Sequence, residues 1–349
     1  MPVFESAKLE KICAGIFEGA GVSEEEACNV ARSLVTANLM GHDSHGVIRV
    51  PQYVQALKDG NVHAGRKIRI LRESDASAVV DGGWGFGQTV CRQAMELAIE
   101  KASAGSVSAV ELFNSSHIGR LGEYAEMAAE SNAIGIVMCN NHGAGRLMCA
   151  HGGIDARMSP NPLAIGIPTG GEFPIVVDMT SSVVAEGKIR VYRNRGGKIP
   201  EGWAVDSEGR PITDPNEFYG PPRGAILPFG GIAAHKGYAL AVAVDILAGA
   251  LGGAGCSRED AARLGNGVFM MALRIEAFTG RDDFKKEVEQ FIRFLKSSRQ
   301  MPGGTGIRMP GEIEHELRRR REKEGVLVDD ETWNQLSRTA QTLDVDFSL

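Results

Sequence analysis

The sequence predicts an α/β protein whose mixed sheet is accompanied by helices from both ends of the chain. Short apolar runs alternate with amphipathic segments between 67 and 185, while helical periodicity dominates residues 1–60 and returns after 312. No exact G-x-G-x-x-G or G-x-G-x-x-A occurs, and the stretches 83–88 (GWGFGQ) and 143–148 (GAGRLM) are only near misses. If a dinucleotide binds, it is therefore held by another route than the glycine turn of the doubly wound fold.

The N-terminal region is expected to contain three helices. In the second helix, Ser23 occupies an N-cap position, and Glu26 three residues later predicts a capping box. Pro51 can occupy the first turn of the third helix, which Gly60 ends.

The central region alternates strands with helices. Strands are expected at 67–74, 76–82, 107–114, 133–140, 163–168, 174–179 and 268–278. Helices are expected at 88–105, 122–132, 237–251, 282–299, 312–325 and 331–343.

These elements predict a division into domains. Residues 1–66 and 310–349 are expected to form a helical domain, and 67–185 with 225–309 the mixed-sheet core. The segment 186–224 is polar and rich in Gly, Pro and Arg, so we expect an excursion with little core of its own.

Two further segments are expected to have a structural rather than a functional role. The stretch 237–255 comes nearest to a membrane span, but Asp245 interrupts it and we expect a buried helix. The run Arg318–Arg321 is expected to be a solvated helix face.

Composition narrows the class of function. The 349 residues carry a net charge of −6 and a sequence pI of about 5.8, which argues against nucleic acid or an acidic membrane as the main partner. Six cysteines include no C-x-x-C pair and no Cys/His cluster with zinc spacing. We therefore expect reduced thiols, a cytoplasmic location and no metal site.

Residues 41–53, GHDSHGVIRVPQY, gather groups that exchange protons and hold anions. Arg49 offers a planar fork for a carboxylate, and His45 titrates near neutrality and can exchange a proton with an oxygen. Ser44 can bond a substrate or orient a neighbour, and Gly46 lets the backbone come close. These groups suit a small 2-oxo or 2-hydroxy acid, and the alternative is an ordinary polar turn between helices.

Five more sites follow expected strands or precede expected helices. His117 follows a strand, where α/β sheets bind ligands, and is a candidate acid or base or a structural histidine. Asn141 can bind amide or ribose groups, and Asp178 can accept from ribose hydroxyls or cap a helix. Lys236 precedes a helix N-terminus, which favours anions, and MPGE at 309–312 ends a glycine-rich loop.

Several motifs, in this order, resemble one family. They are SHGVIRVPQY, NSSHIG, SPNPLAIGIP, VVDMTSSVVAEGKI, IPEGWAVDSEGRPITDP, HKGYALAVAVDILAG and MPGE. From about residue 5 to about residue 345, the chain resembles the malate/L-lactate dehydrogenase type 2 family. This family also holds ureidoglycolate and sulfolactate dehydrogenases, diketogulonate reductase and the piperideine-2-carboxylate and pyrroline-2-carboxylate reductases.

The resemblance implies a non-Rossmann mixed-sheet core that binds NAD or NADP, and a homodimer with active sites near the subunit interface. It implies hydride transfer between nicotinamide and C2 of a small 2-hydroxy or 2-oxo acid. A reductase of cyclic 2-imino acids is the alternative within the family. A non-catalytic dinucleotide binder and a lyase without cofactor are the alternatives outside it.

The family's motifs also imply roles for individual residues. Arg49 and Ser44 would bind the substrate, and His45 or His117, with Ser44, would act in proton transfer. The residues that match cofactor-contacting positions are Asn141, Asp178, Met179, Thr180, Lys236, Pro310, Gly311 and Glu312.

Three departures from the family pattern lie near the expected substrate. Residues 159–162 read SPNP instead of GTNP, Ile118 replaces a frequent Phe, and 140–142 read NNH. The resemblance therefore leaves the substrate open. Three arginines beyond the expected ribose site could hold the 2′-phosphate of NADP or be solvated: Arg190, Arg193 and Arg195.

Overall fold

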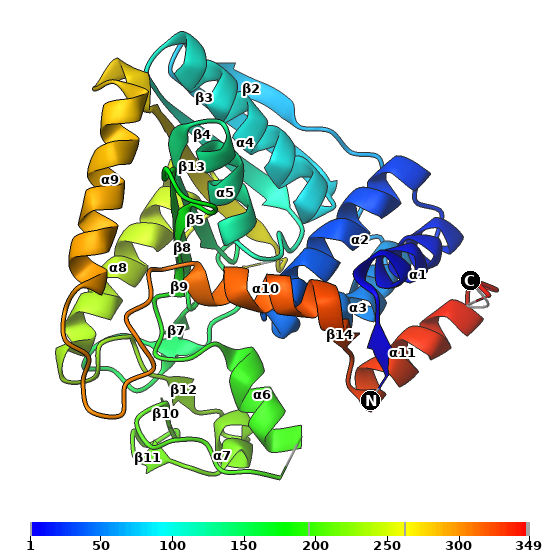
Figure 1. Cartoon of the computed structure of the whole chain (residues 1–349). Helices are drawn as coiled ribbons and strands as arrows, with labels where there is room; N and C mark the ends of the chain where they lie inside the picture. The colour runs from blue at the N-terminus through cyan, green and yellow to red at the C-terminus, as the bar shows by residue number, and fades with distance from the viewer. Residues whose placement is uncertain (1, 195, 262, 347–349) are drawn as a thin grey trace.

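A computed structural model describes residues 2–194, 196–261 and 263–346 (Figure 1). Its centre is a seven-stranded sheet in the order β2-β3-β4-β13-β5-β8-β9. The strands are β2 (Arg69–Glu73), β3 (Ser77–Gly85), β4 (Val107–Ser115), β5 (Ala133–Asn140), β8 (Pro162–Ile167), β9 (Ile175–Thr180) and β13 (Asn266–Arg274). The β3–β4 pair is parallel and the other described pairs in this sheet are antiparallel, so the predicted mixed-sheet α/β fold is confirmed.

Helices α4 (Gly87–Ala104) and α5 (Gly122–Glu130) cover one face of this sheet. Because side chains alternate along a strand, every second residue meets these helices, as Val110, Leu112 and Met270 do, each fully buried. Burial of each such side chain contributes roughly 1.5–3 kcal/mol. This face is therefore the main core of the sheet region.

Helix α8 (Ala234–Asp245) and a π-helical continuation (Ile246–Leu251) pack on the strands from the opposite face. Asp245 is buried and accepts hydrogen bonds from Asn140 and Asn161 of the sheet region. By length and composition alone, Gly231–Leu251 could cross a membrane. The expected buried helix is wrong in one respect, because Ile246 and Leu251 are each more than half exposed.

The two ends of the chain pack together. Helices α1 (Ser6–Gly19), α2 (Glu24–Leu39), α3 (Val50–Lys58) and α11 (Asp330–Gln341) share one apolar core, and α10 (Glu312–Glu324) lies against α2. Strand β1 (Val3–Phe4) pairs antiparallel with β14 (Val326–Leu327). Figure 1 shows this blue and red helical region beside the sheet. The domain boundaries themselves stay a prediction.

The expected capping box at the start of α2 is wrong. Ser23 is the N-cap residue, but its side chain makes no capping hydrogen bond. The Glu26 carboxylate instead accepts the Gly65 amide at 2.6 Å. It therefore ties the connection into the sheet to α2 rather than closing its own helix end.

The segment 186–224 folds around a core of its own, so the expectation of little core was wrong. It contributes α6 (Glu186–Asn194), β10 (Ala204–Val205), β11 (Pro211–Ile212) and α7 (Pro215–Tyr219). With β6 (Met148–Cys149), β7 (Ala156–Met158) and β12 (Ala225–Ile226), its strands form a second sheet in the order β11-β10-β12-β6-β7. Ile189, Ile199 and Phe218 are buried among these elements. Few apolar residues in a polar sequence were enough, because they converge from separate elements.

Candidate active site

One end of the seven-stranded sheet collects the loops that follow β4, β5 and β9. Ser115 at the end of β4 pairs with Asn266, and the next residue of β13 pairs with Asn140 at the end of β5. Pro162 at the start of β8 pairs with Thr180 at the end of β9. The antiparallel register therefore places His117, Asn141 and Thr180 around one sheet end, as ligand sites in open sheets require.

The loop 41–49 approaches this end from the helical region. It consists of two short 3₁₀ turns, and Asn38 of α2 binds both. The Asn38 amide donates to Asp43 at 2.8 Å, and its oxygen accepts the Val47 amide at 2.8 Å. A Cβ on Gly46 would lie 2.1 Å from that oxygen, so glycine is required for this close approach.

Helix α10 holds the same loop from the other side. Arg321 donates to the Asp43 carboxylate at 2.7 and 3.2 Å and also to the Asn38 carbonyl. The solvated helix face that the sequence predicted for Arg318–Arg321 is therefore wrong for Arg321. The C-terminal segment thus fixes a loop that lies near the start of the chain.

The structure brings the predicted catalytic residues together. The His45 and His117 rings are stacked with centroids 5.4 Å apart, and the Ser44 hydroxyl lies 3.0 Å from His45 Nδ1. Arg49 Nε donates to the Ser44 carbonyl at 2.8 Å, and one Nη donates to Gln52 at 2.8 Å. These two bonds fix the guanidinium and leave its remaining N–H groups for an anion.

His117 sits at the end of a buried hydrogen-bond chain. Gln88 donates to the Tyr53 hydroxyl at 2.9 Å, and that hydroxyl lies 2.7 Å from His117 Nδ1. The Gly119 amide also donates to Nδ1 at 3.3 Å, so Nδ1 is an acceptor and Nε2 carries the proton. The sequence interpretation missed Tyr53 and Gln88, although Tyr53 is the tyrosine of the SHG-x-x-R-x-P-x-Y motif.

Burial and charge keep both histidines neutral. Burial, followed by the nearby Arg49 charge, lowers the pKa of His45 to about 3. The same two causes lower the pKa of His117 well below its ordinary value. At neutral pH either ring can therefore accept a proton, and a carboxylate on Arg49 would make protonation easier.

The predicted cofactor residues are placed around the same strands. Asn141 donates to the Ser159 hydroxyl and accepts from Asn266, and the Thr180 hydroxyl donates to the Pro160 carbonyl at 3.1 Å. Met179 precedes Thr180 in β9 and is partly exposed.

Asp178 also lies in β9 and accepts the Gly122 amide at 2.8 Å at the start of α5. The capping contact, its alternative role, is therefore present. Lys236 is exposed in the first turn of α8.

Residues 310–312 lie beside the edge strand of the sheet. The Pro310 carbonyl accepts the Val176 amide of β9 at 3.1 Å, and Gly311 adopts φ +89° at the start of α10. Glu312 pairs with Lys296 at 2.7 Å. These contacts attach α10 to β9, and a cofactor contact by the three residues stays a prediction.

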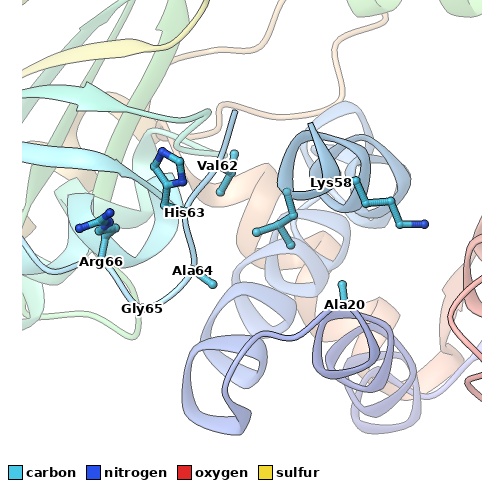
Figure 2. Close-up of a pocket in the computed structure, with 8 residues that line it drawn as sticks. Ala20, Lys58, Val62, His63, Ala64, Gly65 and Arg66 are labelled. Carbon is cyan, nitrogen blue, oxygen red and sulfur yellow. The ribbon is translucent and has the colours of Figure 1, made fainter. Parts of the chain in front are cut away.

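A cavity of about 520 Å³ lies elsewhere, between the ends of α1 and α3 and the connection 62–66. Lys58, His63 and Arg66 line it, but Figure 2 shows Lys58 pointing away from the other two. No predicted site residue borders this cavity, and its cationic groups do not converge. It is therefore not the site of the expected chemistry.

Comparison with known proteins identifies the family. A family model described as malate/L-lactate dehydrogenase matches residues 4–337. The chain belongs to this family. The resemblance predicted from the motifs is confirmed, and the chain is a dehydrogenase that acts on the CH–OH group of 2-hydroxy acids.

Its relatives in the malate/L-lactate dehydrogenase family match along most of their length. A malate dehydrogenase from Pyrococcus horikoshii is 42% identical over 300 residues, which are 84% of this chain and 82% of the relative. An L-sulfolactate dehydrogenase from Methanocaldococcus jannaschii is 38% identical over 96% of this chain and 95% of its own. The crystal structure of malate dehydrogenase from Entamoeba histolytica superposes with a TM-score of 0.91 at 30% identity, covering 100% of this chain and 99% of that one.

Proposed function

We propose that this member of the malate/L-lactate dehydrogenase family oxidises small 2-hydroxy acids, and reduces the matching 2-oxo acids, with NAD or NADP as cofactor. One observation carries the proposal: a fixed arginine lies beside two stacked, neutral histidines at the end of the sheet. A carboxylate anchor next to a proton acceptor is what oxidation of a 2-hydroxy acid requires.

Arg49 holds the substrate carboxylate in this proposal. Its guanidinium is oriented in advance by the Ser44 carbonyl and Gln52, so little freedom is lost when the anion binds. Ser44 also positions His45 through the 3.0 Å contact to Nδ1. The 41–49 loop thus supplies the charge that orients the substrate.

His117 exchanges the proton with the C2 oxygen. The Tyr53 hydroxyl has two acceptors in reach, His117 Nδ1 at 2.7 Å and the His117 carbonyl at 3.4 Å. Tyr53 can donate to Nδ1 while Nε2 carries the proton, or accept from a protonated Nδ1 while it donates to the carbonyl. Only the second arrangement leaves Nε2 of the neutral ring free, so in this tautomer His117 can take the proton of the C2 hydroxyl at Nε2 during oxidation and return it during reduction.

The donor set fits a dinucleotide along β5, β8 and β9. Lys236 lies at a helix N-terminus, which suits a pyrophosphate, and Asp178 offers a carboxylate to ribose hydroxyls. Asn141, Met179 and Thr180 would line the same path, with Pro310, Gly311 and Glu312 beyond the edge strand. The bound nicotinamide would supply or accept the hydride at C2.

We also propose a homodimer in the cytoplasm. None of the 16 residues of α9 (Arg281–Lys296) is fully buried, although its apolar stripe includes Phe291 at 52% and Phe294 at 74% exposure. The exposed Ile246 and Leu251 add a second apolar surface, and unpartnered apolar surfaces of this kind mark interfaces. All six cysteines are free, which suits a reducing compartment.

The proposed dimer can be tested by placing charged side chains on its exposed apolar surfaces. Phe294→Glu combined with Ile246→Glu should yield a monomer in sedimentation velocity, because a buried carboxylate would face the partner. Ile70→Glu on β2, where the wild-type side chain is 43% exposed, is the control and should stay dimeric. A wild-type monomer at micromolar concentration would contradict the proposal.

The reaction is tested by absorbance at 340 nm. Purified protein would be mixed with NADH or NADPH and with pyruvate, oxaloacetate, sulfopyruvate, diketogulonate or a cyclic imine. We expect consumption of one reduced cofactor with a linear 2-oxo acid. Turnover of the cyclic imine alone would instead favour the imino-acid reductase.

A further inference from the structure

Helix α6 stands directly against the substrate end of the site. A Cβ on Gly187 would lie 3.2 Å from Ser44 Cβ and 3.9 Å from its hydroxyl, so the first turn of α6 touches the 41–49 loop. This loop carries the proposed carboxylate anchor. The residues on the same face of α6 are therefore candidates to touch the rest of the substrate.

Arg190 and Val191 share that face with Gly187. Residues three and four apart on a helix are neighbours, whereas Lys188 is turned by about 100° and Ile189 faces the buried core. Val191 is 42% exposed, and the Arg190 side chain is 53% exposed. A cation and an apolar side chain thus lie where α6 meets the site.

The Arg190 guanidinium has a defined direction. It donates to both oxygens of Glu186, through Nε at 3.3 Å and Nη2 at 2.7 Å, and the Tyr219 hydroxyl donates to the same carboxylate at 2.7 Å. Two of its five N–H groups are used in this pair. Glu186 and Tyr219 therefore hold the arginine in place in the absence of a ligand.

Arg190 and Arg49 lie close enough to affect each other electrostatically. Burial is the main cause that lowers the pKa of Arg49, and the Arg190 charge lowers it further, while Tyr53 and Glu186 act in the opposite sense. Arg193 on the next turn is used differently, because its guanidinium packs over the Tyr219 ring at 4.5 Å. Arg195 lies outside the described residues. Of the described arginines in this segment, Arg190 is the one beside the substrate anchor.

We propose that Arg190 is a specificity residue that binds a second anionic group on the substrate, a carboxylate or sulfonate on the carbon next to C2. The inference rests on the proposed function and adds the substrate class. The substrate would be a dianion with one anionic group at each end of a short chain, held by Arg49 at the C1 carboxylate and by Arg190 at the second anionic group. Glu186 positions Arg190 by accepting both of its hydrogen bonds. A substrate with a methyl group at that end would forgo the second contact.

The test compares substrates rather than rates alone. Arg190→Gln should lower kcat/KM for oxaloacetate and sulfopyruvate on the order of 10- to 100-fold, mostly through KM, and leave pyruvate within about 3-fold. Arg190→Lys should recover part of the loss, because the charge remains while the planar fork is lost. Lys188→Gln removes an exposed cation from the same helix and should change none of these ratios.

A second measurement separates this inference from the proposed function. Titration calorimetry of L-malate and L-lactate, with wild type and with Arg190→Gln in the presence of NADH or NADPH, reads binding without turnover. Selective loss of malate binding supports the inference even if no 2-oxo acid is reduced. Equal effects on malate and lactate overturn it, and so does an Arg190→Gln defect confined to the KM for NADPH, which would assign the arginine to a 2′-phosphate.

Discussion

The two loops that meet in the site are held in different ways. Loop 41–49 is fixed from outside, by Asn38 of α2 and by Arg321 of α10. Loop 114–119 is an extension of the sheet, since Asn266 of β13 accepts the Ile118 amide at 3.0 Å. The first loop carries Arg49, the proposed carboxylate anchor, and the second carries His117, whose Nδ1 lies 2.7 Å from the Tyr53 hydroxyl. Charge recognition and proton transfer are therefore expected to depend on separate supports, and four sets of substitutions test this separation.

The largest difference is expected between the two histidines. His117→Gln should lower kcat by about 10²- to 10⁴-fold, the usual contribution of a general acid or base, while His45→Gln should cost only about 10-fold. The measurement is steady-state kinetics in both directions. A larger loss in His45→Gln would move the proton-transfer role to loop 41–49.

Arg49→Met should damage substrate binding most. We expect a rise in KM of roughly 10²- to 10³-fold, because a charge-assisted carboxylate contact is lost. Arg49 also lowers the pKa of both histidines, so its removal should raise these pKa values toward 6.5. Oxidation requires the neutral ring, so the acid limb of the kcat/KM profile should move to higher pH.

The pH profile of Arg49→Met is compared with that of wild type between about pH 4 and pH 9. Because the pKa of His117, the proposed proton acceptor, lies well below its ordinary value in wild type, the wild-type profile should be flat near neutrality. An unchanged acid limb in the variant would show that the Arg49 charge does not set the pKa of the histidine that titrates.

Tyr53→Phe should have a smaller effect that appears in kcat rather than KM. The phenyl ring keeps the packing but removes the hydroxyl that lies 2.7 Å from His117 Nδ1, so we expect a loss of about 10-fold. Gln88→Leu should show a weaker loss, again in kcat, since Gln88 reaches His117 only through Tyr53. Normal kcat in Tyr53→Phe would show that the chain does not set the state of His117.

Arg321→Met should have the smallest effect on chemistry. It removes the ion pair to Asp43 and the bond to the Asn38 carbonyl, and we expect a loss of roughly 1–3 kcal/mol of stability with a few-fold rise in KM. The matched control is Arg320→Met, whose exposed side chain pairs at 3.9 Å with Glu324 on its own helix. Thermal unfolding measures the change in stability, and steady-state kinetics measure the change in KM. Equal changes in the Arg321→Met and Arg320→Met variants would contradict the role of Arg321.

Local patterns were enough to predict most elements. The strands at 107–114 and 133–140 and the helices at 88–105 and 122–132 agree with β4, β5, α4 and α5 to within about two residues at each end. Their apolar periodicity is a property of the chain itself. The capping box was wrong because Glu26 found a distant partner in Gly65, which no local pattern reveals.

The sequence by itself determined the chemical groups of the site and the family. Ser44, His45 and Arg49 lie in one short motif, and a motif fixes which side chains are present. Only the tertiary structure decided their arrangement: the register that joins β4, β13, β5, β8 and β9 at one end, and the chain from Gln88 through Tyr53 to His117. It also brought α6 and α10 onto the 41–49 loop. The physical reason is that these contacts join residues tens to hundreds of positions apart, so they exist only once separate elements have packed.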